Sequence, residues 1–217
     1  MKIRIKNNPS GDKLQKLLGF VSKKSDMFSV TRYFNGKLDD SIIESIQDDL
    51  KTSMLQEDEE RRKEYSENII SHNRLNNIMH FKNDKEAWKY FDDLKEQDMR
   101  VLNDISLFGS DKPFETDAPD FIRHEFTRET TVTRGPVFEM CYFRIGVQFE
   151  LLLESMKHLY DYPYIIQDVN FEDIAFYQKD KIILAICSHE EFSLLNLDEA
   201  WYKEFVELEI KHKVEDE

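Results

Sequence analysis

The stretch from Asp173 to Leu208 restricts the fold more than any other part of the chain. It contains three apolar runs, IAFY, IILAIC and FSLLNL, which the polar segments QKDK and SHEE separate. Short apolar runs between turns are typical of antiparallel strands joined into a meander. Asp198 follows as the N-cap of a helix, and Trp201 and Phe205 lie on the apolar face of that helix. The sequence therefore predicts a β-meander with a C-terminal helix packed on it.

Apolar periodicity elsewhere predicts an α+β fold with a mainly antiparallel sheet of about six or seven strands. Four further strands are predicted at residues 1–6, 26–34, 121–134 and 136–145. Residues 145–152 fit both a strand and a helix, because alternation continues to Leu151 whereas a helical spacing begins at Phe149. The sequence leaves the choice between the two open.

A long helical segment interrupts the predicted sheet between residues 38 and 107. Apolar residues recur at helical spacing in its first and last parts, whereas residues 56–64 carry no apolar face. The loop of residues 109–119, with two prolines and a glycine, is the predicted internal seam. Because 217 residues suit one large domain, we expect a single α+β domain over residues 1–217, with residues 38–107 as a helical insertion.

The chain is strongly acidic, with a formal net charge of −14 at pH 7 and a pI of about 4.9. Such a charge repels nucleic acid and anionic membranes, and it favours a basic protein partner or serves solubility alone. No apolar run reaches the length of about 18 residues that a membrane-spanning helix needs. The first residues lack the apolar core of a signal peptide, and both cysteines lie inside apolar runs. We therefore expect a reduced protein of the cytoplasm.

The polar strands around residues 121–144 are the best candidate for chemistry. These strands carry imidazole, carboxylate and guanidinium groups, and the six candidate residues among them are Arg123, His124, Glu125, Arg128, Glu139 and Arg144. A histidine beside carboxylates and guanidinium groups suits general acid–base catalysis or anion binding. The competing interpretation is a pair of exposed strands whose opposite charges pair across the ladder. Catalysis would require these side chains to meet in a concave, desolvated pocket.

No metal or cofactor site is predicted. His72 and His80 are eight positions apart, which separates them by about 12 Å along a helix and prevents them from sharing one ion. Cys187 and His189 resemble a nucleophile and a base on one strand face, but the sequence favours a structural cysteine followed by a turn. The chain contains no phosphate-binding glycine loop and no EF-hand loop. We therefore expect neither a metal nor a cofactor.

Two functions remain open. The first is a non-enzymatic, cytoplasmic interaction module that binds a basic protein through an acidic surface, and inhibitor and immunity proteins are one such class. The alternative is a small-molecule enzyme or ligand-binding domain that uses the polar residues of the strands at 121–144. A deep pocket around His124 would favour the alternative. A flat acidic face with exposed rings would favour the interaction module.

Overall fold

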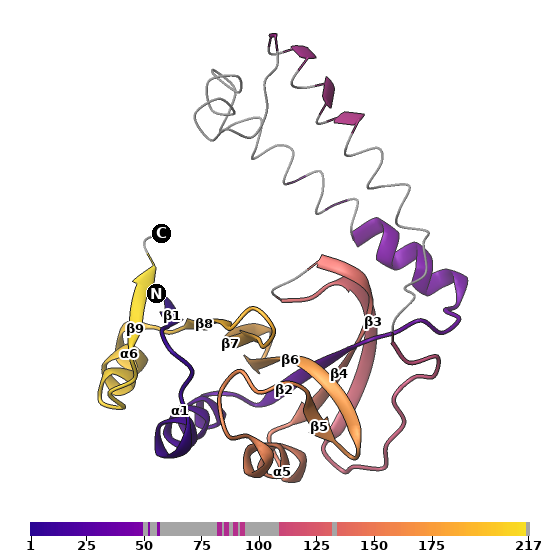
Figure 1. The fold of residues 1–217 in the computed structure, drawn as a ribbon. Helices are drawn as coiled ribbons and strands as arrows, with labels where there is room; N and C mark the ends of the chain where they lie inside the picture. The colour runs from indigo at the N-terminus through magenta and orange to yellow at the C-terminus, as the bar shows by residue number, and fades with distance from the viewer. Residues whose placement is uncertain are drawn as a thin grey trace. The chain divides into compact units, whose positions relative to one another are not determined.

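The computed structural model describes residues 1–49, 52, 56, 82–83, 85–86, 89–90, 92–93, 109–131 and 134–215. The chain divides into two compact units. One comprises Met1–Gly36 with Ser106–Glu217, and the other comprises Lys37–Ile105. The first unit contains the sheet and the helices labelled α1, α5 and α6 in Figure 1. That the whole chain behaves as one domain stays a prediction.

Nine antiparallel strands form the sheet among the residues described. They are β1 (Lys2–Ile5), β2 (Met27–Tyr33), β3 (Phe121–Glu129), β4 (Arg134–Arg144), β5 (Tyr164–Ile166), β6 (Val169–Gln178), β7 (Lys181–Cys187), β8 (Phe192–Asn196) and β9 (His212–Glu215). The strand order is β3-β4-β2-β6-β7-β8-β1-β9, and β5 pairs with β6 outside this path. The predicted antiparallel α+β fold is confirmed.

Strands β6, β7 and β8 form the predicted meander. Ile174 of β6 lies opposite Ile186 of β7, and Leu184 of β7 lies opposite Leu195 of β8. All four side chains are buried, as the apolar runs predict. The predicted number of six or seven strands is too low, because β5 and β9 have only three and four residues. Unlike the similarly short β1, in which Ile3 and Ile5 alternate with charged residues, these two segments show no clear alternation, and pairing with a neighbouring strand decides their conformation.

Residues 147–152 adopt a helix, whereas residues 145 and 146 form a bend before it. The described helices of the first unit are α1 (Gly11–Lys24), α5 (Val147–Ser155) and α6 (Glu199–Val206). The backbone N–H of Gln148 donates to the Asp120 carboxylate at 2.8 Å, which satisfies one of the unpaired donors in the first turn of α5. Phe149 and Leu152 then face the core. Because Asp120 lies before two intervening strands in the sequence, periodicity could not reveal this cap.

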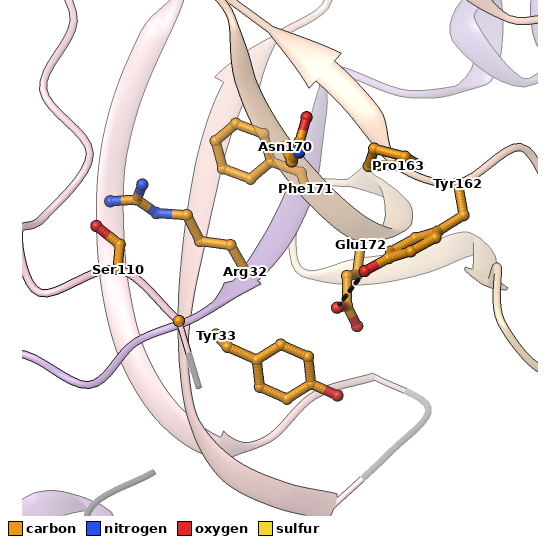
Figure 2. A pocket seen from close by; sticks show the side chains of 9 residues that line it. Arg32, Tyr33, Ser110, Tyr162, Pro163, Asn170, Phe171 and Glu172 are labelled. Carbon is orange, nitrogen blue, oxygen red and sulfur yellow. Dashed lines mark hydrogen bonds between the residues drawn. The ribbon is translucent and has the colours of Figure 1, made fainter. Parts of the chain in front are cut away.

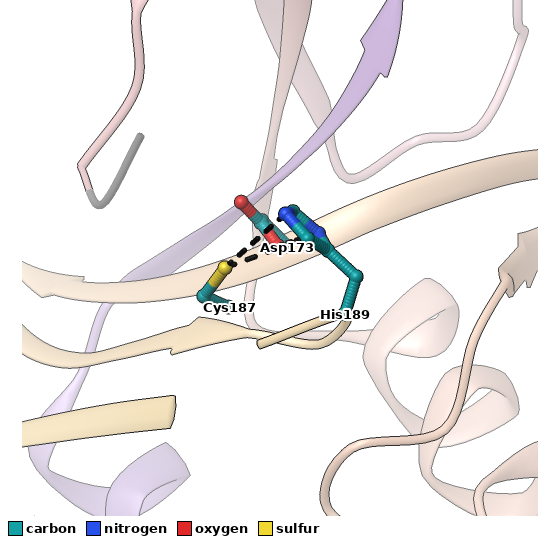
Figure 3. A group of neighbouring side chains, drawn as sticks. All are labelled: Asp173, Cys187 and His189. Atoms are coloured by element: carbon teal, nitrogen blue, oxygen red, sulfur yellow. Dashed lines mark hydrogen bonds and ion pairs between the residues drawn. The ribbon is translucent and has the colours of Figure 1, made fainter. Parts of the chain in front are cut away.

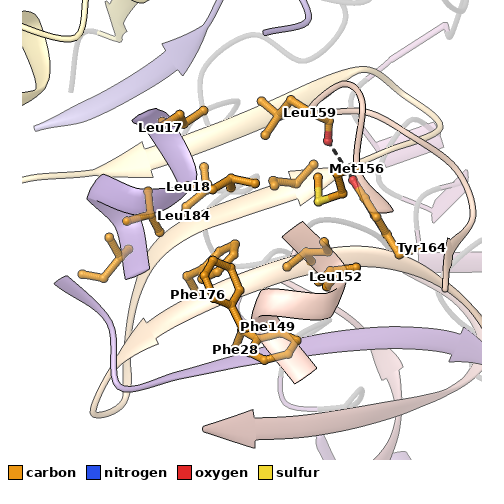
Figure 4. Packing of buried hydrophobic residues seen from close by; sticks show 14 of the residues in the cluster. Leu17, Leu18, Phe28, Phe149, Leu152, Met156, Leu159, Tyr164, Phe176 and Leu184 are labelled. Carbon is orange, nitrogen blue, oxygen red and sulfur yellow. Dashed lines mark hydrogen bonds between the residues drawn. The ribbon is translucent and has the colours of Figure 1, made fainter. Parts of the chain in front are cut away.

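Helices α1 and α5 pack against one face of the sheet (Figure 4). Leu17 and Leu18 of α1 and Phe149 of α5 join Phe28 of β2 and Phe176 of β6 in the main core. The ring of Phe149 lies 6.0 Å from that of Phe28 and 5.8 Å from that of Phe176 between centroids. A smaller buried cluster on the opposite side of the strands consists of Met140, Tyr142, Ala175, Tyr177 and Ala185.

The C-terminal helix α6 begins where the sequence predicts. The Asp198 carboxylate accepts a hydrogen bond from the Trp201 backbone N–H at 2.8 Å, so Asp198 is the N-cap. Phe205 is fully buried in the main core, together with residues of the meander. Its ring also lies 6.1 Å from that of Phe20 and 5.0 Å from that of His212 between centroids. The helix therefore contacts α1 and β9 in addition to the meander core.

The predicted insertion of residues 38–107 is described in part. Residues 40–49 are helical, and so are the described residues at 52, 56, 85–86, 89–90 and 92–93. The greater part of the polar segment 56–64, together with His72 and His80, lies outside the described residues. The predicted seam contains no helix or strand from residue 111 to residue 119. In the part of the chain that the structure describes, no helix has the length and apolar character needed to cross a membrane.

Candidate functional site

Glu139 forms the centre of a buried polar network, and the network contains two of the six predicted residues. Its carboxylate is fully buried and accepts hydrogen bonds from Arg32 Nε at 2.7 Å and from the Phe114 backbone N–H at 2.7 Å. A second Arg32 nitrogen, Nη2, lies 2.6 Å from the same carboxylate. His124 Nδ1 lies 2.8 Å from its other oxygen. Both carboxylate oxygens are therefore satisfied within the protein.

This network holds the loop after residue 109 against the sheet. Arg32 also donates from Nη2 to the backbone carbonyl of Lys112 at 2.7 Å. The Arg32 guanidinium carbon lies 5.8 Å from the centroid of the Phe114 ring, which belongs to the main core. Arg32 comes from β2, outside the stretch that the sequence singled out. A network that fills its own hydrogen-bonding capacity stabilises the fold and leaves little capacity for a substrate.

The remaining predicted residues lie elsewhere on the two strands. Arg123 Nε donates to the Glu125 carboxylate at 2.7 Å, and the Tyr142 hydroxyl donates to the same carboxylate at 2.9 Å. Because successive strand residues point to opposite faces, this group and His124 lie on different sides of β3. Arg144 is exposed at the end of β4, and Arg128 is half-buried in β3. The structure thus brings four of the six residues together in two pairs, His124 with Glu139 and Arg123 with Glu125, and not in one cluster.

A pocket opens beside β2 and β6 (Figure 2). Its volume is about 190 Å³, and its lining residues are Arg32, Tyr33, Gly109, Ser110, Tyr162, Pro163, Asn170, Phe171 and Glu172. The Tyr162 hydroxyl donates to the Glu172 carboxylate at 3.2 Å. Burial raises the pKa of the Glu172 carboxyl above its ordinary value, and burial likewise raises the pKa of the Tyr162 hydroxyl. The pocket therefore offers hydroxyl donors and one partly desolvated carboxyl group.

Asp173, Cys187 and His189 form a compact group at the end of the β6–β7 pair (Figure 3). The Cys187 sulfur lies 3.9 Å from His189 Nδ1 and 3.8 Å from His189 Nε2. His189 Nδ1 lies 3.9 Å from Asp173 Oδ1. Burial, followed by the charge of Asp173, raises the pKa of the Cys187 thiol to about 12. Burial also raises the pKa of the Asp173 carboxyl.

The sequence drew attention to Cys187 and His189 but not to Asp173. Asp173 belongs to the neighbouring strand and has a backbone φ of 36°, a left-handed conformation that aspartate tolerates better than most residues. The pairing of Ile174 with Ile186 places Asp173 next to Cys187 across the two strands. Counting antiparallel pairs outward from the QKDK turn would have placed Asp173 opposite Ile186, because a register shift between Phe176 and Tyr177 moves the pairing by one residue. The predicted meander alone could not reveal this contact.

No known protein family, curated protein or solved structure matches this chain. A fold alone does not determine a function, so the function has to be argued from the sites themselves.

Proposed function

We propose that this protein is a non-enzymatic interaction module that binds a basic, amphipathic segment of another protein. The binding region is the α5–β5 surface, which we define by Val147, Glu150, Leu151 and Glu154 of α5 and Ile165 of β5. Helix α5 and strand β5 contact each other in the first unit. Inhibitor and immunity proteins that neutralise a basic target are one class with this requirement.

The observation that carries the proposal is an apolar stripe left open on α5. Val147 and Leu151 are 59% and 53% exposed, and they lie one turn apart on the same side of the helix. Ile165 of the adjacent strand is 51% exposed. Three large aliphatic side chains that are more than half exposed over two contacting elements are typical of a protein-binding surface.

Charge selects the kind of partner. Glu150 and Glu154 are exposed and also lie one turn apart on α5, so an acidic stripe runs beside the apolar one. The formal net charge of −14 favours a basic partner over the whole molecule as well. A partner with alternating apolar and basic side chains satisfies both stripes, whereas an acidic partner is repelled.

A hollow next to this surface provides room for a partner side chain. Its volume is about 280 Å³, and its lining residues are Ser155, Met156, Lys157, Asp161, Tyr162, Pro163, Tyr164 and Ile165. Tyr162 is 58% exposed, so an aromatic ring borders the hollow. Side chains that anchor protein interfaces fill pockets of this kind. Both cysteines are free thiols, which supports a reducing compartment such as the cytoplasm.

The test uses a short amphipathic peptide of leucine and lysine as the partner probe, and the same peptide with glutamate in place of lysine as the control. We expect only the lysine peptide to bind, with an affinity that falls as salt rises. Leu151→Ser and the pair Glu150→Lys with Glu154→Lys should each weaken binding by about tenfold, which corresponds to roughly 1.4 kcal/mol.

Matched substitutions on α6 and just after it control for general effects of charge and exposure. Val206 is 46% exposed, and Glu207 and Glu209 are exposed. Val206→Ser, and Glu207→Lys with Glu209→Lys, should leave peptide binding unchanged. Equal weakening by both sets would mean that net charge alone attracts the peptide. Self-association in sedimentation that Leu151→Ser abolishes would mean that the surface pairs with a second copy of the chain.

A small-ligand site is the second candidate function, and the pocket beside β2 and β6 favours it. The partly desolvated Glu172 carboxyl lines that pocket, and a free amino acid offers an ammonium group to match it. Titration calorimetry with free amino acids tests this function. Tyr162→Phe should weaken binding, because it removes the hydroxyl that contacts Glu172. Absence of heat with every amino acid would reject it.

A further inference from the structure

We propose that Asp173, Cys187 and His189 bind a divalent metal ion of the zinc type. Each residue offers one ligand atom, and the three atoms all lie within 4.8 Å of one another. Thiolate sulfur, imidazole nitrogen and carboxylate oxygen are the ligands that Zn²⁺ takes in proteins. Among the described residues, these three side chains form a group whose possible ligand atoms lie close to one another. Figure 3 shows the three side chains converging.

The distances are close to those of a tetrahedral site. Zinc lies about 2.3 Å from sulfur and about 2.0–2.1 Å from nitrogen, so two such ligands at the tetrahedral angle are roughly 3.5 Å apart. Here His189 Nδ1 lies 3.9 Å from the Cys187 sulfur and 3.9 Å from Asp173 Oδ1. Closing these two gaps requires shifts of a few tenths of an ångström.

The scaffold fixes two ligands and leaves the third adjustable. Cys187 is fully buried on β7. The Ser188 backbone N–H donates to Asp173 Oδ1 at 3.1 Å, which orients that carboxylate. The His189 side chain lies on the turn after β7 and is 44% exposed, so solvent reaches the group from its side. An ion can therefore enter beside His189 and meet two ligands that are already in place.

Glu172 is the candidate for a fourth ligand, because it lies next to His189. Its Oε2 atom is 4.0 Å from His189 Nδ1, while its Oε1 atom accepts the hydrogen bond from Tyr162. Because Glu172 also lines the pocket beside β2 and β6, the fourth position faces that pocket. Either the Glu172 carboxylate or a water molecule completes the tetrahedron.

The ligand chemistry selects the ion. A thiolate and an imidazole favour Zn²⁺ or Co²⁺ over Mg²⁺ and Ca²⁺, which require oxygen ligands. A nucleophile–base pair is the competing use of Cys187 and His189. Such a pair needs one imidazole nitrogen aimed at the sulfur, whereas both nitrogens of His189 are almost equally far from it. The geometry thus fits coordination better than proton transfer.

The experiment titrates the full chain with Co²⁺ and then displaces it with Zn²⁺. We expect a thiolate-to-cobalt charge-transfer band, which Zn²⁺ removes. Cys187→Ser should abolish the band, and His189→Gln and Asp173→Asn should each weaken binding by about a hundredfold. Glu172→Gln weakens binding if the carboxylate is the fourth ligand, and it leaves binding unchanged if water is.

Two control variants separate this site from other thiols and imidazoles. Cys141→Ser removes the other buried cysteine, and His158→Gln removes an exposed histidine that contacts Asp161 at 3.2 Å. Both should leave the cobalt band unchanged. His189→Gln alters an exposed turn, so it keeps the test valid even if Cys187→Ser does not fold. Cobalt binding without a thiolate band, or an unchanged cobalt affinity in His189→Gln, would overturn the proposal. Rapid alkylation of Cys187 at neutral pH would indicate a nucleophile instead.

Discussion

Replacing Arg32 with methionine should be among the most destabilising exchanges of a charged residue in this protein. The Arg32 side chain is 11% exposed, and its partner Glu139 is fully buried. The substitution keeps most of the side-chain volume but removes two contacts to the carboxylate, at 2.6 and 2.7 Å, and one to the Lys112 carbonyl. The result is a buried negative charge that has lost its guanidinium partner.

The magnitude follows from what remains around Glu139. Breaking a buried ion pair by removing one partner costs about 3–5 kcal/mol, because the surviving charge stays desolvated. The Phe114 N–H and His124 still contact the carboxylate, which places the expected loss near the lower end, about 3 kcal/mol. For a chain of this length that loss lowers the melting temperature by roughly 6–12 °C. Denaturant unfolding with linear extrapolation measures the free energy directly.

Arg123→Met is the matched control. Arg123 and Glu125 are also 2.7 Å apart, but their side chains are 46% and 48% exposed. Solvent screening limits such a pair to less than about 1 kcal/mol. Combining Arg32→Met with Glu139→Gln should cost less than the sum of the two single changes, because it removes the unpaired charge. A loss below about 1 kcal/mol for Arg32→Met, or equal losses for both arginines, would refute the reasoning.

Three further predictions concern the core, the acidic side chains and the thiols. Phe205→Ala should cost about 3–5 kcal/mol in a denaturant melt, because the ring is fully buried, and the partly buried Trp201 should cost less when changed to alanine. Burial raises the pKa of Asp173 above its ordinary value of 3.8. Protonated Asp173 therefore contributes its whole share to the free energy of unfolding below pH 3.8. This contribution is lost as the pH rises through the pKa of Asp173 in the folded state. Asp173→Asn should then melt higher than the parent at neutral pH in chelator, with the difference vanishing in acid. Thiol reagents should modify Cys141 and Cys187 slowly at neutral pH, since burial raises the pKa of both thiols. Rapid modification of either thiol would contradict the last expectation. An Asp173→Asn protein that melts at a lower temperature than the parent at neutral pH would contradict the one before it.

The candidate sites were only partly predictable. His124 and Glu139 were both singled out by their residue types, and the structure places them in contact. Arg32 was not, because it sits in a strand that is distant in the sequence and carries no motif. Asp173 was missed for a related reason, since its role depends on the cysteine across the strand pair and not on its own neighbours in the chain.

The sequence by itself determined the local structure. Alternating apolar residues and short polar turns predicted the β6–β7–β8 meander, and the position of Asp198 predicted the start of α6. Both signals depend on residues within a few positions of one another. The direction of a side chain and the conformation of a turn depend on residues a few positions apart. A short segment of the sequence is therefore enough to predict them.

Tertiary structure alone decided how the strands are ordered and which polar groups meet. Strand β2 lies between β4 and β6, although a helical segment and β3 separate it from both in the sequence. The position of β2 between β4 and β6 places Arg32 beside Glu139, and it places Tyr33 beside the pocket that contains Glu172. Periodicity shows which face of a strand is buried, but not which strand becomes its neighbour. The neighbour is chosen by packing and hydrogen bonding over the whole sheet, because an interior strand such as β2 has to satisfy its backbone groups on both edges.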